Sequence, residues 1–138
     1  IESGNGATLQ VVAGQLDTVK GPVQTYIPVT ALNGSFEAGS SINISLPDDQ
    51  VALAYVLDGD VTVNGEHAVT GHEMVEFDGM GDIRIEAESA ARVLIVSGTP
   101  IGEPVVSSGP FVMNTHTEIM EAMRDAQMGK MGVLIEEF

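Results

Sequence analysis

Apolar and polar residues alternate over much of the first 98 residues, with the period of two that is typical of half-buried β-strands. The alternation is clearest at residues 41–46, SINISL, and at residues 51–57, VALAYVL. In the second run it predicts a face of large residues and an opposite face of small ones. The large face holds Val51, Leu53, Tyr55 and Leu57, and the small face holds Ala52 and Ala54.

Turn-forming residues divide the same region into segments about eight to twelve residues apart, the spacing of β-sandwiches and barrels. Asn64-Gly65 predicts a two-residue type I′ hairpin between strands at residues 60–63 and 66–69. Another turn is expected at residues 78–81, DGMG. The other expected strands are residues 9–13, 72–77, 83–86 and 92–97.

Residues 26–36, YIPVTALNGSF, are β-branched but interrupted. Pro28 removes a ladder donor, and Asn33-Gly34 is a pair typical of turns. We therefore interpret this run as an edge strand followed by a turn.

The pattern changes after Gly98. Residues 99–114 contain three prolines and predict an extended, irregular tail. Thr115 and Glu118 then have the spacing of a capping box, and helical periodicity follows to Gly129. We therefore expect one all-β domain over residues 1–138, with a barrel at about 8–98, a tail at 99–114 and a helix at about 116–128.

Charge narrows the range of partners. The chain of 138 residues has 20 acidic and 5 basic side chains, for a formal net charge of −15. Nucleic acids and anionic membranes are bound by clusters of Lys and Arg, whereas the five cations here are scattered, so we expect neither contact. No apolar run approaches the roughly 20 residues that span a bilayer. The chain has no cysteine, which suits a reducing compartment, and we expect a cytoplasmic location.

Three segments resemble one known family. They are the run VKGPVQTYIPVTALNGSFEAGSSINISLP, the run AYVLDGDVTVNG and the tail GTPIGEPVVSSGPFVMNT, which precedes a glutamate-bearing helix. Together they resemble the C-terminal domain of pirin-type proteins, over about residues 9–132. The resemblance implies a cupin-type double-stranded β-helix, or jelly-roll barrel, that is the second of two barrels. Since the chain begins with Ile1, we expect it to be part of a longer polypeptide.

The resemblance also implies iron or another divalent metal in the N-terminal barrel, held by three histidines and a glutamate. A metal cupin needs His-x-His and a carboxylate four residues later, because strand alternation then points the ligands into one interior. Alignment on Tyr55-Val56-Leu57 places these positions at Ser45, Pro47 and Val51, none of which binds iron well. We therefore expect neither a metal nor a cofactor site in this chain.

The three histidines of the chain are the remaining candidates for metal ligands or catalytic residues. His67 and His72 flank the Thr70-Gly71 turn, close to several glutamates, and are interpreted as solvated strand and turn residues rather than a surface metal site. His116 lies in the first turn of the expected helix, with no nucleophile paired to it. We predict no catalytic residue.

The favoured function is that of a non-catalytic C-terminal cupin domain, which supports or binds a metal-carrying N-terminal barrel. Phe111 and Met113 are the expected interdomain or partner-packing residues. One alternative is that the intact parent opens flavonols as a quercetin 2,3-dioxygenase-like enzyme, although this chain alone would have no turnover. Another is a free-standing cupin that dimerises, or that binds a second protein or a small apolar molecule in a pocket lined by Val51, Leu53 and Tyr55.

Overall fold

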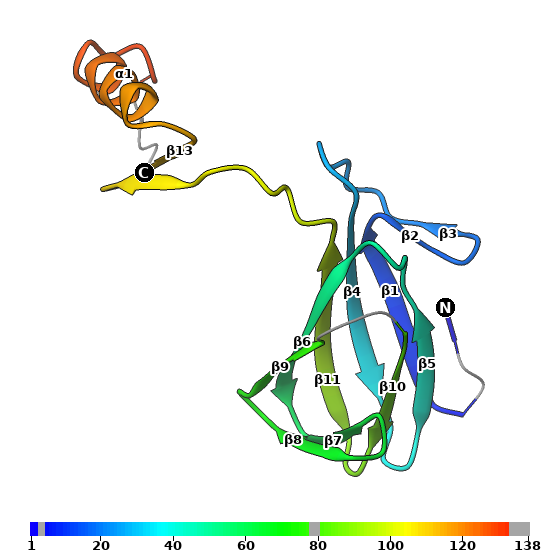
Figure 1. Ribbon diagram of the computed structural model, residues 1–138. Coiled ribbons are helices and arrows are strands. Elements are labelled where there is room, and N and C mark those ends of the chain that lie inside the picture. The colour runs from blue at the N-terminus through cyan, green and yellow to red at the C-terminus, as the bar shows by residue number, and fades with distance from the viewer. Residues whose placement is uncertain (3–4, 78–80, 133–138) are drawn as a thin grey trace, which may run out of the picture. The chain divides into compact units, whose positions relative to one another are not determined.

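The computed structural model describes residues 1–2, 5–77 and 81–132. The chain forms two compact units, Ile1–Pro100 and Ile101–Phe138. The first unit is a β-barrel and the second is a hairpin with a helix (Figure 1). The prediction of an all-β fold with a C-terminal helix is therefore confirmed. Most of the turn expected at residues 78–81 lies outside the described residues.

Two antiparallel sheets form the barrel. The larger has the order β1(Ala7–Ala13), β4(Val29–Phe36), β11(Ala91–Gly98), β6(Val51–Asp58) and β9(Met74–Phe77). The smaller has the order β5(Ser41–Ser45), β10(Asp82–Ala87), β7(Asp60–Val63) and β8(His67–Thr70). A separate hairpin of β2(Gln15–Leu16) and β3(Val19–Lys20) occupies part of the loop after β1.

Aliphatic side chains from both sheets fill the barrel interior and form one core. Leu32, Ile44, Ile85 and Val93 are each 0% exposed. These residues lie on alternating positions of their strands, so one face of each strand is buried and the other faces outward.

The interpretation of residues 26–36 was wrong. β4 runs unbroken through Asn33-Gly34 and lies between β1 and β11, so it is neither an edge strand nor a turn. Gly34 serves packing instead: a Cβ there would lie 2.7 Å from Cε2 of Phe36, a ring that is 4% exposed. A glycine inside a strand can mark such a close approach as well as a turn.

The small face of β6 is the inner one, so the alternative of a pocket lined by Val51, Leu53 and Tyr55 does not match the described barrel interior. Ala54 and Val56 are each 1% exposed and point into the core, whereas Val51 is 59% exposed. Leu53 and Tyr55 are half-buried on the outer face. The small side chain of Ala54 faces inward next to the large side chain of its partner on β11, Ile95, which is 1% exposed.

The turn conformation expected at Asn64-Gly65 is confirmed, but the expected two-residue connection was wrong. Both residues have positive φ angles, 52° and 71°, as a type I′ turn requires. Val63 pairs with His67, however, so three residues connect the strands and β8 begins at His67 rather than at residue 66.

In the second unit the predicted tail contains a hairpin of β12(Val106–Ser108) and β13(Phe111–Met113). Helix α1(His116–Gln127) packs on both strands and buries Ile119 and Ala122. The capping box is present: the Glu118 N–H donates to Thr115 Oγ1 at 3.2 Å, and the Thr115 N–H donates to Glu118 Oε2 at 2.8 Å. No helix in the described part of the chain is long and apolar enough to cross a membrane.

Candidate functional site

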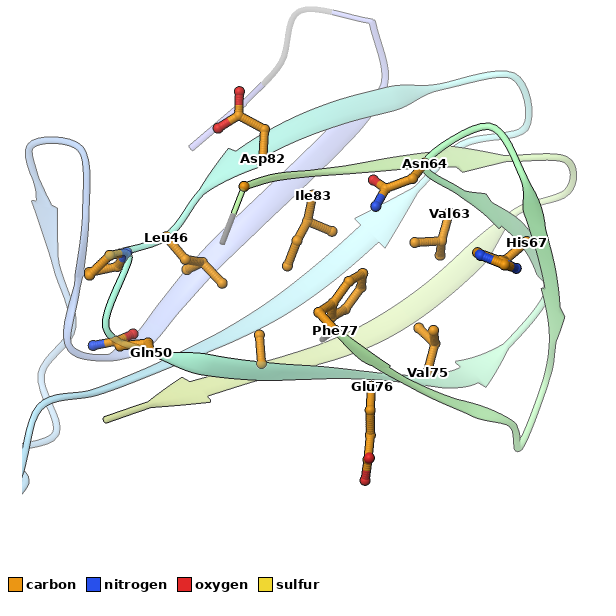
Figure 2. A pocket seen from close by; sticks show the side chains of 13 residues that line it. Leu46, Gln50, Val63, Asn64, His67, Val75, Glu76, Phe77, Asp82 and Ile83 are labelled. Carbon is orange, nitrogen blue, oxygen red and sulfur yellow. The ribbon is translucent and has the colours of Figure 1, made fainter. Parts of the chain in front are cut away.

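A cavity of about 450 Å³ lies at one end of the barrel, within the size range of small-molecule pockets (Figure 2). It is lined by residues of β6 and β9 of the larger sheet, by residues of β7, β8 and β10 of the smaller one, and by the turn after β5. Its interior is apolar, with side chains from Leu46, Ala52, Val63, Val75, Phe77 and Ile83. Polar side chains lie at its ends, among them Gln50, Asn64 and His67.

Two carboxylates near the cavity face away from its centre. The side chain of Glu76 extends outward from β9 (Figure 2). Asp82 also points away, and its Oδ1 accepts a hydrogen bond from Ser45 Oγ at 2.6 Å. The cavity therefore has acidic groups at its rim but an apolar interior.

The structure brings only one of the three aligned ligand positions to this cavity. Pro47 lines the rim, in the turn closed by a 3.1 Å bond from the Gln50 N–H to the Pro47 oxygen. Ser45 is exposed at the end of β5, and Val51 is 59% exposed. Of the residues between Ser45 and Val51, Leu46 and Gln50 line the cavity together with Pro47.

The side chains around the cavity do not fit a catalytic metal. Iron, nickel and related ions in cupin-like sites require imidazole nitrogens and carboxylate oxygens that converge on one point. The hydroxyl of Ser45 is already bonded to Asp82, and Pro47 and Val51 have no donor atom. Within residues 1–2, 5–77 and 81–132, no group of three or more His, Cys, Asp or Glu side chains could hold a metal ion.

The three histidines lie in different settings. His67 is exposed at the start of β8 and borders the cavity. His72 is exposed in a turn with φ 72°, and its N–H donates to the Val56 oxygen at 2.7 Å. His116 is the exposed first residue of α1, in the other unit.

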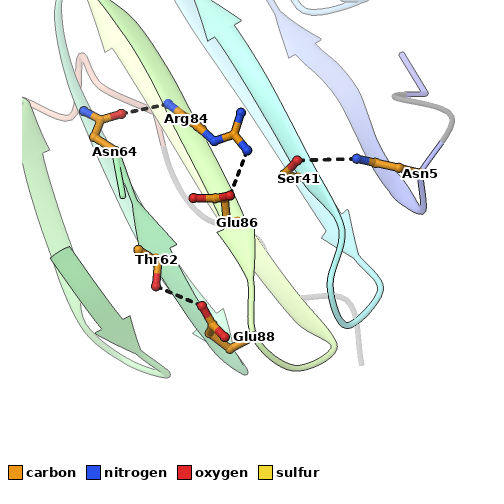
Figure 3. A network of polar contacts seen from close by, with 7 residues as sticks. All are labelled: Asn5, Ser41, Thr62, Asn64, Arg84, Glu86 and Glu88. Atoms are coloured by element: carbon orange, nitrogen blue, oxygen red, sulfur yellow. Dashed lines mark hydrogen bonds and ion pairs between the residues drawn. The ribbon is translucent and has the colours of Figure 1, made fainter. Parts of the chain in front are cut away.

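Charged groups on the outer face of the smaller sheet pair with one another (Figure 3). Arg84 Nη2 donates to Glu86 Oε1 at 2.8 Å, and this hydrogen bond lowers the pKa of the Glu86 carboxyl. In the second unit, Lys130 lowers the pKa of Asp125 in the same way. A catalytic general acid needs a raised carboxyl pKa, so neither residue has the character of one.

Sequence reasoning missed the cavity residues, although one signal for them was present. Leu46 continues the inward face of Ile42 and Ile44, so the alternation of residues 41–46 already directs it to the interior. Val75 and Phe77 flank the polar Glu76 on β9, so the same alternation directs both of them to the interior.

Comparison with known proteins identifies the family. The model of the pirin C-terminal cupin domain matches residues 31–132. The chain belongs to this family. The predicted resemblance to pirin C-terminal domains and the predicted cupin fold are therefore both confirmed.

Relatives of the pirin domain are similar over nearly the whole chain. Pirin-1 of Arabidopsis thaliana is 38% identical over 135 residues, which are 93% of this chain and 47% of that protein. A crystal structure of quercetin 2,3-dioxygenase from Acinetobacter baumannii is 34% identical with a TM-score of 0.88, covering 94% of this chain and 46% of that one. The chain thus spans about half the length of these relatives.

A more distant pirin shares the fold. The bacterial pirin YhhW from Escherichia coli, in complex with nickel(II), superposes with a TM-score of 0.60 at 18% identity, over 68% of this chain and 40% of that one. At this identity the likeness concerns the fold alone.

Proposed function

We propose that this pirin domain is the metal-free, non-catalytic half of a two-barrel protein, and that it supports or binds a metal-carrying barrel. One observation carries the proposal. The barrel mouth is lined by Leu46, Ala52 and Phe77, and its described side chains do not form the converging imidazole and carboxylate set that a metal cupin needs. A barrel with this mouth retains the fold but lacks the ligands for metal chemistry.

The length of the relatives supports a two-barrel parent. The matched region is less than half of Pirin-1 and of the Acinetobacter baumannii enzyme, so each has room for a second domain of similar size. Iron or another divalent metal would then be bound in that other half, as nickel(II) is bound in the Escherichia coli pirin. A cytoplasmic location is part of the proposal and is supported by the lack of cysteine.

The second unit offers a surface for the partner. Six of its large apolar side chains are between 57% and 75% exposed: Ile101, Val105, Val112, Met120, Met128 and Met131. Phe111 and Met113 are half-buried and flank Val112 on β13. Apolar side chains gathered in so short a segment are typical of protein contacts. We infer that this surface, with Phe111 and Met113 behind it, packs on the second barrel rather than on a second copy of the chain.

A second function is favoured by the similarity to the Acinetobacter baumannii enzyme. An intact parent would then be a quercetin 2,3-dioxygenase-like enzyme whose active site lies in the other barrel. In that case this domain contributes stability and part of the surroundings of the site, and the isolated chain has no turnover.

Metal loading tests the central claim. The 138-residue chain is incubated with iron(II) or nickel(II), desalted and measured by mass spectrometry of the metal, with the Escherichia coli pirin as positive control. We expect substoichiometric metal in this chain, because the described residues around its cavity offer no convergent imidazole and carboxylate ligands. Stoichiometric metal that survives desalting would refute the proposal.

The partner surface is tested in a two-barrel chimera, in which this chain replaces the matched 135 residues of Pirin-1. The double variant Val112→Thr/Met120→Gln removes exposed apolar atoms without adding charge. It should destabilise the chimera by about 2 kcal/mol and leave the isolated chain unchanged, as thermal unfolding would show.

The matched control is Val51→Thr/Met74→Gln, which makes the same two changes at barrel positions that are 59% and 53% exposed. It should leave the chimera unchanged. Destabilisation by the control alone would place the partner on the barrel instead. Concentration-dependent sedimentation of the isolated chain, abolished by Val112→Thr/Met120→Gln, would indicate self-association.

A further inference from the structure

The cavity is a large gap between inward-facing side chains at one end of the barrel. Elsewhere the interior is filled by residues such as Leu32, Ile44 and Ile95, which are at most 1% exposed. At the cavity end Ala52 of β6 lines the space together with Leu46 and Ile83, so one of the lining positions has a small side chain where a larger one would fill part of the space. The opening thus results from particular residues and not from loose packing in general.

The interior of the cavity suits an aromatic body. The ring of Phe77 points into it, with Val63, Val75 and Ile83 around the ring (Figure 2). An aromatic side chain that faces an open apolar space can stack on a flat ligand as well as bury its surface. A ligand of two fused rings is small enough to enter the volume of about 450 Å³ with room to spare.

The ends of the cavity supply fixed polar groups. Asn64 Oδ1 accepts the Arg84 N–H at 2.8 Å, which leaves the amide nitrogen of Asn64 on the cavity side, near His67 (Figure 2). At the other end, Gln50 Oε1 accepts from Ser97 Oγ at 2.7 Å, and Ser97 is 2% exposed. These bonds hold both amides in place, so a ligand hydroxyl or carbonyl would meet prearranged partners.

The charges around the cavity favour an uncharged ligand over an ionic one. The rim carries Glu76 and Asp82, and the chain has a net charge of −15, so an anion would be repelled. Among the described residues a cation would find no carboxylate that points into the interior, since Glu76 points outward and Asp82 is bonded to Ser45.

We propose that this cavity binds an uncharged aromatic molecule that has a hydroxyl or carbonyl group at one end. The ring system lies against Phe77 and Ala52, and the polar group reaches Asn64 and His67. This site is independent of the proposed partner surface, because every residue that forms it belongs to the barrel unit.

The probe is 2-naphthol, whose fluorescence can be followed because the chain contains no tryptophan. We expect saturable binding with a dissociation constant on the order of 100 μM. The charged analogue 2-naphthoate has the same rings and should bind about tenfold more weakly. Amide signals of Leu46, Val75 and Phe77 should shift in the NMR spectrum on addition of 2-naphthol. Absence of saturation, or shifts confined to other residues, would overturn the proposal.

Two variants locate the site. Ala52→Leu fills the cavity and should weaken 2-naphthol binding about tenfold or more, whereas the control Ala68→Leu, at an exposed position of β8, should leave it unchanged. Phe77→Leu keeps an apolar side chain but removes the ring, and we expect about a fivefold loss. Circular dichroism checks that each variant is folded. If Ala52→Leu does not fold, the affinity of Phe77→Leu for 2-naphthol decides whether the ligand binds in the cavity. Wild-type affinity in either folded variant would contradict the proposed site.

Discussion

Replacing Ile85 with alanine should lower the free energy of unfolding of the barrel by about 3–4 kcal/mol. Ile85 is 0% exposed and lies in the middle of β10, where it pairs with Ile42 on one side and Val63 on the other. The change removes three carbon atoms from the core. The two flanking strands are fixed by their ladder hydrogen bonds, so the space left behind cannot close fully.

Urea denaturation, followed by NMR amide signals of the barrel, measures this loss without interference from the second unit. The matched control is Ile101→Ala, the same substitution at a position that is 63% exposed. It should change barrel stability by less than about 0.5 kcal/mol. A loss below about 1 kcal/mol for Ile85→Ala would mean that the core is less tightly packed than described.

Gly59→Ala should destabilise the barrel by about 3 kcal/mol or more. Gly59 has a φ of 82°, and the left-handed region costs an alanine about 1–2 kcal/mol. A Cβ at this position would also collide with the Ala90 oxygen and lie 2.7 Å from the Ala91 Cα. These atoms are backbone, and Ala91 is held in β11 opposite Phe36, so the neighbour cannot move aside cheaply.

Gly65→Ala separates the cost of the left-handed backbone from the cost of the collision with β11. Gly65 has a similar φ of 71°, but a Cβ there would meet no atom within 4 Å. We expect a loss of about 1 kcal/mol from backbone strain alone. The difference between the two unfolding free energies then measures the contact with β11. Equal losses would show that this contact adds nothing.

Features of the sequence that act locally predicted the structure well. The capping box of Thr115 and Glu118 and the positive φ angles of Asn64-Gly65 depend on neighbouring residues only. The alternation that marks β5 and β6 is local in the same sense, since it follows from the pleat of a single strand.

Features that depend on distant strands were not predictable. β6 is apolar on both faces, and only its pairing with β11 shows that Ala54 and Val56 are the inner residues. Asn33-Gly34 has the form of a turn, and the space that Gly34 leaves for Phe36 can be seen only in the packed barrel. The pocket expected beside Val51, Leu53 and Tyr55 was misplaced for the same reason: the cavity lies on the opposite face of β6, at Ala52.

The two apolar faces of β6 also bear on how the chain avoids self-association while it folds. Residues 51–57, VALAYVL, form seven consecutive uncharged positions of high β-propensity, the composition of segments that stack into intermolecular sheets. In the folded barrel β6 is paired on both sides, and the short edge strand β9 next to it carries Glu76 outward. Charged residues on short edge strands discourage pairing with a second molecule. Together with Asp49 and Asp58 on either side of the segment, Glu76 thus acts as a gatekeeper for this uncharged strand.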